Sequence, residues 1–352
     1  MFTQCAIAAG IALSIMLLVM PKFLPYLKKL KFGQTIYELG PQAHKAKQGT
    51  PNMGGIVIAG ATVVSLVLVS IITGIKDGWN FGLNNYLWPL LFVALGSMAV
   101  GFADDFIKDV KKNHEGLKPK QKLVGQLFVG LGFSLYCYFK VGSDVVIPFT
   151  DHTWPLGIFY IPIMTVLVMF MTNSANLQDG VDGILSSVTT VGMAAFGVIA
   201  LFCVNALSFA DRFNVVSYSF QVLAFGCFAL VGACIGFLRF NRHPAKIFMG
   251  DTGSMFIGGM MVGVAMLIKM EFLLIPICFT CIMSSVSVMM QTTYFKITKK
   301  KYGQGRRIFK MTPIHHHFEL SGMKENQIVL MYAAVTLVLS VIAILSVSRL
   351  FN

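Results

Sequence analysis

The chain has 352 residues, of which 56% are hydrophobic and only 12% are charged. Soluble domains average about 25% charged residues, so this chain has too few polar side chains to coat a soluble fold of its length. The net charge of +13 raises the question of a nucleic-acid partner. No nucleic-acid-binding module stands among the hydrophobic runs, and we expect no such partner. The composition therefore predicts a protein that resides in the lipid bilayer.

Ten apolar stretches are long enough to cross the hydrocarbon core as helices, which takes about 20 residues each. Helices are expected because a chain in lipid must satisfy its backbone hydrogen bonds internally. Lysines follow the first stretch rather than precede it, so we expect that stretch to be retained as a span. The prediction is an all-α polytopic fold and a single integral membrane domain over residues 1–352. In chain order the predicted spans are 3–24, 53–74, 87–103, 123–140, 157–175, 184–206, 218–238, 254–270, 272–295 and 327–349.

Basic residues gather in alternate loops of this predicted arrangement. Four segments hold 23 of the 28 lysines and arginines, namely 22–50, 104–122, 239–252 and 296–326. The positive-inside rule makes these segments cytoplasmic and places both termini on the outer side. Ten of the 15 acidic residues are also cytoplasmic, so this face carries the whole net charge of +13. Membrane topology and attraction to anionic lipid headgroups can explain the positive charge of this face. A binding site for a multiply anionic substrate explains it as well.

The first polar cluster on this face lies at the end of the third predicted span. Asp104 and Asp105 are adjacent there, and Lys108 follows one helical turn later. Neighbouring carboxylates at a membrane edge repel each other and lose hydration unless a cation or a shared proton compensates them. A pair of aspartates also ends a helix at the interface, but we favour a functional site.

The second cluster closes the fifth predicted span with Asn173, Asn176, Asp179 and Asp182. Glycines after both aspartates allow the backbone to approach a ligand closely. The spacing does not fit a calcium-binding EF-hand loop, which needs a bidentate glutamate at its end. The segment therefore indicates a binding loop of another kind.

The third cluster places Asp251 between two glycines, just before the eighth predicted span. The start of a helix offers free N–H groups that favour phosphate, and Asp251 is well placed to hold a metal that bridges it. A simpler explanation is an aspartate that only caps the helix.

The fourth cluster consists of His315, His316 and His317, preceded by Arg306, Arg307 and Lys310. Three consecutive histidines are improbable in a core, and an internal run is no terminal tag. Zinc is one possible ligand, but zinc ligands usually have wider spacing and separate partners. Binding to phosphate or sugar hydroxyls fits the oxygen-rich chemistry of the other clusters better.

A weaker basic signal, His44, Lys45 and Lys47, lies in the first cytoplasmic loop. With it, five elements bring acidic, amide and basic side chains to one face, which favours an enzyme. A transporter or flippase would place ionisable groups near mid-membrane and show internal repeats. A non-catalytic membrane anchor with a basic face is a further alternative.

Five motifs, in order along nearly the whole chain, resemble those of the phospho-N-acetylmuramoyl-pentapeptide transferase family. This family is part of the polyprenyl-phosphate N-acetylhexosamine-1-phosphate transferase superfamily, and the three histidines separate it from sister enzymes. The chain departs from the usual family pattern at Asn52, Gln178 and Val181, where Thr, Thr and Leu are typical. The motifs are GTPNMGG (49–55), DD (104–105), NLQDGVDG (176–183), FMGDTGS (248–254) and PIHHHFE (313–319).

The resemblance implies a reaction in the bacterial cytoplasmic membrane. Phospho-N-acetylmuramoyl-pentapeptide would pass from its UDP carrier to undecaprenyl phosphate, giving UMP and the lipid I of peptidoglycan synthesis. Mg²⁺ held by Asp251 would neutralise the pyrophosphate. Asp104 or Asp105 would orient the lipid phosphate or take its proton. A two-step route through an aspartyl-phosphate is the alternative mechanism.

The resemblance also implies the substrate-binding residues, and a homodimer is expected from the family alone. A related sugar-1-phosphate transferase using another UDP-sugar remains the alternative within this class. Lysines would contact phosphates, other polar and aromatic residues would bind the nucleotide, and the histidines would bind sugar or phosphate. The residues are Lys108, Lys112, Lys120, Lys122, Asn173, Asn176, Asp179, Asp182, Phe248, Gln291, His315, His316 and His317.

Overall fold

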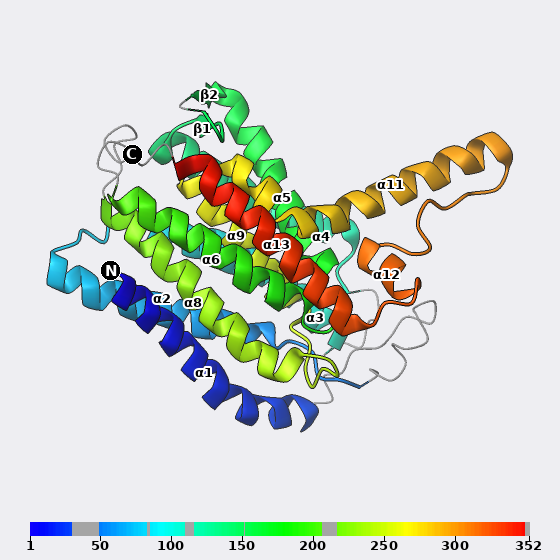
Figure 1. Cartoon of the computed structure of the whole chain (residues 1–352), viewed down its shortest axis with the longest axis horizontal. Helices are drawn as coiled ribbons and strands as arrows, with labels where there is room; N and C mark the ends of the chain where they lie inside the picture. Colours follow the sequence, from blue (N-terminus) through cyan, green and yellow to red (C-terminus); the bar gives the residue numbers. More distant parts are fainter. Residues whose placement is uncertain (30–48, 83–84, 110–115, 151, 206–216, 349–352) are drawn as a thin grey trace.

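Long apolar helices lie side by side over most of the chain (Figure 1). A computed structural model describes residues 1–29, 49–82, 85–109, 116–150, 152–205 and 217–348. Nine helices in this described part are long and apolar enough to cross a membrane, which confirms the all-α polytopic fold. A tenth long helix, α11, qualifies only together with the bent segment before it. The long helices are α1 (Phe2–Lys29), α2 (Gly55–Asp77), α3 (Leu87–Asp109), α4 (Pro119–Tyr136), α5 (Tyr160–Gln178), α6 (Ile184–Asn205), α8 (Ser217–Asn241), α9 (Gly250–Leu267), α11 (Phe279–Tyr302) and α13 (Glu325–Val347).

The predicted span 272–295 is broken rather than continuous. Two short helices, η4 (Glu271–Leu273) and α10 (Leu274–Ile277), precede α11. The chain bends by 84° between Glu271–Ile277 and Phe279–Tyr302. Pro276 lies just before the bend, and its missing N–H and its ring favour a kink there. The predicted stretch is therefore two helical pieces that meet at an angle rather than one continuous helix, and the distal half of α11 projects from the bundle (Figure 1).

Two helix ends near the polar clusters also differ from the prediction. The third helix continues through Asp109, so Asp104 and Asp105 lie inside α3 rather than after it. The eighth predicted span begins early, at Gly250, which places Asp251 in the first turn of α9. Hydropathy locates the apolar part of a helix, whereas these polar turns continue the helix beyond that part.

Short elements connect the helices. Strands β1 (Asp144–Val146) and β2 (Thr153–Pro155) pair antiparallel, with Val145 opposite Trp154. This two-stranded sheet is an addition to the predicted helices and lies at one end of the bundle (Figure 1). The remaining short elements are η2 (Cys137–Val141), η3 (Gly157–Phe159) and α12 (Ile314–Glu319).

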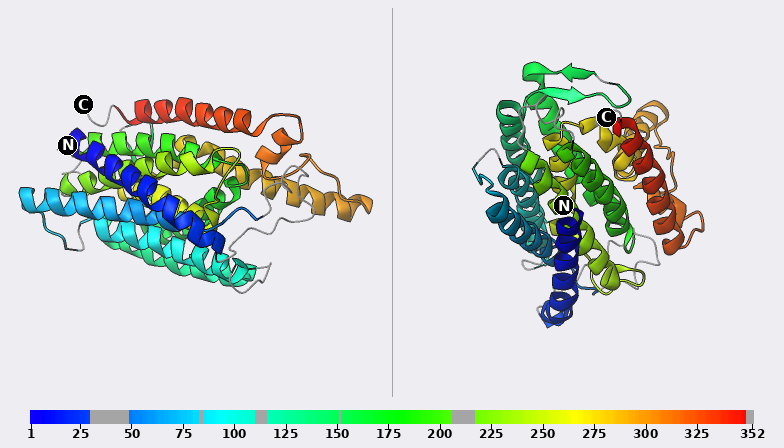
Figure 2. Two further views of the ribbon diagram at one scale, coloured as in Figure 1. Left: turned by 90° about the horizontal axis from the view of Figure 1, so that it is seen from below. Right: turned by 60° about the vertical axis from the view of Figure 1, so that its left-hand side comes forward.

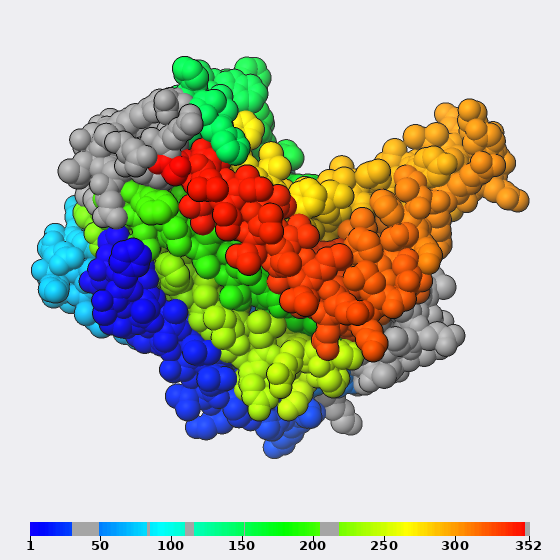
Figure 3. All heavy atoms as spheres, viewed as in Figure 1, coloured from blue at the N-terminus to red at the C-terminus, as the bar shows by residue number. Residues whose placement is uncertain are grey.

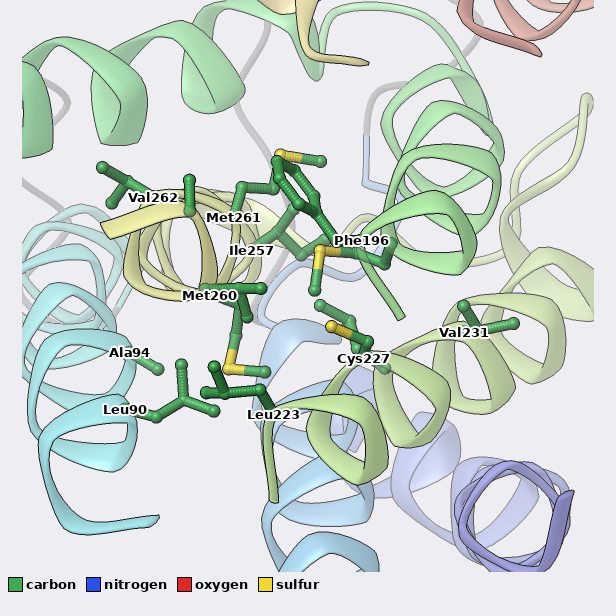
Figure 4. Close-up of a cluster of buried hydrophobic side chains, with 14 of the residues drawn as sticks. Leu90, Ala94, Phe196, Leu223, Cys227, Val231, Ile257, Met260, Met261 and Val262 are labelled. Atoms are coloured by element: carbon green, nitrogen blue, oxygen red, sulfur yellow. The ribbon is translucent and has the colours of Figure 1, made fainter. Parts of the chain in front are cut away.

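Helix α9 is buried along almost its whole length. Its apolar side chains pack against α3, α6 and α8 in the middle of the molecule (Figure 4). The residues that meet there include Leu90 and Ala94 of α3, Phe196 of α6, Leu223 and Cys227 of α8, and Ile257, Met260 and Met261 of α9. This packing fixes the position of the first turn of α9, which carries Asp251.

The two ends of the bundle differ in what they carry. Helix α1 begins and helix α13 ends at the same end (Figure 2). The helices alternate in direction along the chain. The last turns of α3 and α5 and the first turns of α9 and α13 therefore lie at the opposite end of the bundle. The polar clusters of the sequence therefore meet at one end of the bundle.

Candidate active site

Four charged side chains from three helices meet at this end. Lys122 Nζ, on α4, lies 2.8 Å from Asp251 Oδ2 and 3.7 Å from Asp104 Oδ2. Lys108 Nζ, on α3, lies 2.5 Å from Asp104 Oδ2 and 3.2 Å from Asp251 Oδ2. Each ammonium group thus bridges the same two carboxylates. The pairing explains how two aspartates are tolerated close together in a largely enclosed place.

Asn176 connects helix α5 to this cluster. Its Nδ2 donates to Asp251 Oδ1 at 2.8 Å and to Ser254 Oγ at 3.0 Å, and its Oδ1 accepts from Lys122 Nζ at 3.5 Å. The side chain of Asp251 is 18% exposed, against 4% for that of Asp104. Asp251 is therefore the carboxylate of the cluster that a substrate or cation can reach more easily.

Asp105 holds the beginning of α9. Its Oδ2 accepts from the backbone N–H of Thr252 at 2.8 Å and from the Thr252 hydroxyl at 2.6 Å. Its Oδ1 accepts from the backbone N–H of Asp251 at 3.1 Å. The helix start that was predicted to receive phosphate is thus occupied at these two N–H groups by the protein's own carboxylate, which the helix dipole favours.

The GTPNMGG segment packs directly onto the segment before α9. Phe248 N donates to Pro51 O at 2.8 Å, and Gly54 N donates to Phe248 O at 2.9 Å. Asn52 Nδ2 reaches Asp105 Oδ1 at 3.3 Å and Asp109 Oδ2 at 3.2 Å. Two motifs that are far apart in the sequence therefore support one another and the aspartate pair.

Gly101 allows α3 to approach α9 closely. A β-carbon added there would lie 2.2 Å from the carbonyl oxygen of Asp251. We expect Gly101→Ala to displace the first turn of α9 and to destabilise the protein by about 1–3 kcal/mol, the usual cost of overpacking. Thermal unfolding in detergent measures this loss. Gly60→Ala is the control, because a β-carbon at Gly60 meets nothing within 4 Å; equal melting temperatures for the two variants would contradict the prediction.

A second group of ionisable side chains consists of Asp182, His243 and Glu325. One ligand atom of each lies within 4.8 Å of the others, a geometry that can hold a metal ion. His243 Nδ1 is 3.0 Å from Asp182 Oδ2 and 3.4 Å from Glu325 Oε1. The backbone N–H of Ala245 also donates to Asp182 Oδ2, at 3.0 Å. These residues form a hydrogen-bonded group of their own, separate from the contacts of Asp251.

Asp179 ends α5, and its side chain belongs to the same acidic surroundings. Desolvation, followed by the charges of Asp251, Asp182 and Asp105, raises the pKa of Asp179 well above its usual range.

The three histidines lie in α12 but have different surroundings. His315 is fully buried and packs against Gly180, where an added β-carbon would meet His315 Nε2 at 2.3 Å. His316 Nδ1 lies 3.0 Å from Glu319 Oε2. His317 Nδ1 accepts from the backbone N–H of Lys310 at 3.1 Å. The histidine helix therefore packs against the loop that follows α5.

Some predicted binding residues already have partners within the protein. Asn173 exchanges two side-chain hydrogen bonds with Gln126, at 2.9 and 3.1 Å, which joins α5 to α4. Gln291 Oε1 accepts from the backbone N–H groups of Ile308 and Phe309 at 2.9 and 3.0 Å. These contacts position the elements around the site.

Of the remaining predicted lysines, only Lys120 is described. It is exposed and lies in the first turn of α4, two residues before Lys122. Lys112, and the first-loop residues His44, Lys45 and Lys47, lie outside the described residues.

Several contributors to the site were not assigned from the sequence. They surround the predicted site residues: Gln126 bonds to Asn173, and His243 contacts both Asp182 and Glu325. Asp109 is connected to Asp105 because Asn52 donates to both. His243 lies five residues before the FMGDTGS motif, so its place beside a motif was a usable signal. Gln126 and Glu325 carry no such signal, because Gln126 is a single polar residue in the middle of α4 and Glu325 is the first residue of α13.

Comparison with known proteins places these features in a family. Residues 87–269 match the model described as glycosyl transferase family 4. A phospho-N-acetylmuramoyl-pentapeptide-transferase from Thermoanaerobacter sp. (strain X514) is 40% identical over 350 residues, which cover 99% of this chain and 100% of that protein. A protein of the same name from Bacillus thuringiensis (strain Al Hakam) is 41% identical over 344 residues, or 96% of each chain. By this similarity over nearly its full length, the chain belongs to the phospho-N-acetylmuramoyl-pentapeptide transferase family.

Proposed function

We propose that this protein transfers phospho-N-acetylmuramoyl-pentapeptide from UDP to undecaprenyl phosphate in the bacterial cytoplasmic membrane. An oxygen of the lipid phosphate forms a bond to the β-phosphorus of the sugar nucleotide. The bond between that phosphorus and the oxygen of UMP breaks, and UMP leaves with the electron pair. The product is lipid I, the lipid-linked sugar of peptidoglycan synthesis.

The observation that carries this proposal is the pair of lysines that bridges two carboxylates at one end of the bundle. A pyrophosphate and a lipid phosphate are both anionic, so bringing them together requires cations more than a strong base. Lys108 and Lys122 supply two ammonium groups, each within reach of Asp104 and Asp251. When substrate phosphates arrive, these ammonium groups are placed to exchange carboxylate partners for phosphate oxygens.

We assign Mg²⁺ binding to Asp251, with hard oxygen ligands from its neighbours and from the substrate. Mg²⁺ usually keeps several waters and binds one or two carboxylates together with substrate phosphates. The partly exposed Asp251 carboxylate, beside Asp104, fits that ligand set. Bound there, the ion would neutralise charge on the pyrophosphate as UMP leaves. The group around Asp182 includes a histidine, which suits softer divalent metals better than Mg²⁺.

Asp104 and Asp105 take different roles in this proposal. The phosphate monoester has a second pKa of about 6, so it is largely ionised at neutral pH and needs little help from a base. Asp104 shares both lysines with Asp251 and is placed to orient the incoming phosphate. Asp105 is 1% exposed and bonded to the start of α9, which favours a positioning role. We favour direct transfer over an aspartyl-phosphate intermediate.

We further propose that the site faces the cytoplasm and that both termini face the outer side. The positive-inside count supports this orientation. The proposed unit is one domain over residues 1–352, and a homodimer stays a prediction from the family.

The test is release of UMP by the purified protein from UDP-N-acetylmuramoyl-pentapeptide, with undecaprenyl phosphate and Mg²⁺ supplied. We expect release that requires both substrates and stops when magnesium is chelated. The control replaces the sugar nucleotide with UDP-N-acetylglucosamine. Release with that control alone would overturn the proposed substrate and favour a sister transferase.

A further inference from the structure

The distal half of α11 and the loop after it form an arm that projects from the bundle. We define the α11 arm as residues 294–310. In the space-filling view the arm stands clear of the bundle, and it also extends beyond the other helices in the rotated view (Figures 2 and 3). Nearly all of the buried residues of α11 precede the arm, the last of them being Gln291, and only Thr298 is buried within it. The proximal half packs on the bundle, and the distal half does not.

Charge changes abruptly where the helix leaves the bundle. From Phe279 to Phe295 the helix has no charged residue, whereas residues 296–310 contain seven cations and no acid. All seven are exposed, and no carboxylate in the described part of the chain lies within ion-pair distance of them. The cations are Lys296, Lys299, Lys300, Lys301, Arg306, Arg307 and Lys310. Positive charge without a carboxylate partner among the described residues attracts anionic groups to the arm.

The faces of the arm, and of the helical turn just before it, carry different side chains. Met290, Tyr294 and Ile297 follow at i, i+4 and i+7, so they form one apolar stripe along the helix. They are 45%, 39% and 57% exposed, and Lys301 continues the stripe at its distal end. Given 100° per residue, Lys300, Lys296 and Lys299 lie about 60°, 100° and 160° around the helix from Ile297. The lysine arc therefore begins beside the stripe and continues to the face opposite it.

The returning loop covers a third face and holds the arm in shape. Arg306 N donates to Thr298 Oγ1 at 2.8 Å. The Arg306 guanidinium lies 4.8 Å from the centre of the Tyr302 ring. Because these contacts fix the loop against one side only, the apolar stripe and the lysine arc stay uncovered. A rigid helix with exposed aromatic, aliphatic and lysine side chains is typical of elements that lie in a membrane interface.

We propose that the α11 arm lies in the interface of the bilayer and binds anionic phospholipid headgroups. The stripe Met290, Tyr294 and Ile297 enters the acyl region, and the three lysines bind headgroup phosphates. Topology explains an excess of cations on one side of a membrane protein. It does not explain why the segment 104–122 mixes its cations with four acids while the arm has none. The sideways exit of α11 places this uncompensated charge over lipid rather than over the bundle.

The test compares the binding of phosphatidylglycerol and phosphatidylcholine to the full-length protein by native mass spectrometry. The variant is Lys296→Gln/Lys299→Gln/Lys300→Gln, and we expect its preference for phosphatidylglycerol to fall at least about tenfold, since each interfacial lysine contributes to anionic-lipid binding. The matched control is Lys22→Gln/Lys28→Gln/Lys29→Gln, three exposed lysines of α1 that lower the net charge equally. The control should keep most of the preference, as should the Lys→Arg version of the arm variant.

Equal losses in the arm variant and the α1 control would show a general effect of net charge and would overturn the proposal. An unchanged preference in the arm variant would also overturn it and would point to a soluble partner for the arm. Melting temperatures of all variants should match, because none of these lysines contacts the core. The measurement reads lipid binding and not UMP release, so it stands independently of the proposed transferase reaction.

Discussion

Asp251→Asn is expected to reduce the rate of UMP release by about 10³-fold, the scale seen when a principal electrostatic contact to a transition state is lost. The carboxylate receives both lysines on Oδ2 and Asn176 on Oδ1. An amide keeps one oxygen, so its NH₂ group must face either the two ammonium groups or the Nδ2 donor of Asn176. It also removes the negative charge that would attract Mg²⁺. Steady-state kinetics at saturating Mg²⁺ and substrates measure the effect.

Asp109→Asn is the matched control for Asp251→Asn. Asp109 lies on α3 close to the same end, and its Oδ2 accepts from Asn52 rather than from a lysine. The substitution removes one negative charge from the same region, and activity should stay within a few-fold of the parent. If both variants lost activity equally, the effect would come from net charge and the assignment of Asp251 would be wrong. Full activity in Asp251→Asn that survives chelation would contradict it as well.

The membrane architecture follows from the sequence because hydrophobic length is a direct physical requirement of the bilayer. The described spans confirm most of the predicted stretches, from Phe2–Lys29 to Glu325–Val347. The break before α11 was missed because Pro276 stands among strongly apolar residues, so the mean hydropathy of the run stays high. Hydropathy reports where a segment prefers to lie, and it contains no information about the direction in which the chain leaves a bend.

The site was predictable as a set of motifs but not as a set of contacts. Lys122 lies far from Asp251 in the sequence, yet their side chains are 2.8 Å apart. Such pairings depend on the crossing of α3, α4 and α9, which close glycine contacts such as that of Gly101 allow. Adjacent positions also diverge, because neighbouring residues on a helix point about 100° apart. Asp104 and Asp105 share a motif, but one contacts lysines and the other contacts α9.

Asp105→Asn is expected to destabilise the protein by about 3 kcal/mol, since it leaves buried donors without an acceptor. The two carboxylate oxygens accept from four donor groups, which belong to Asn52, Asp251 and Thr252. An amide has one oxygen, and its NH₂ group must face donors of the same kind. We therefore expect a lower melting temperature and a loosened first turn of α9, with a secondary loss of activity as Asp251 shifts.

Asp104→Asn should give the opposite pattern, and the comparison separates positioning from chemistry. Asp104 Oδ1 accepts from the backbone N–H of Leu117 at 2.7 Å, and an amide oxygen can keep that bond. Its other oxygen contacts Lys108 and Lys122, which retain Asp251 as a partner. Stability should therefore fall by less than about 1 kcal/mol, while UMP release falls strongly. A variant of Asp105 that is fully stable yet inactive would show that Asp105 touches the reacting groups. The paired aspartates would then share one chemical role, because neither carboxylate would be needed to hold α9 in place.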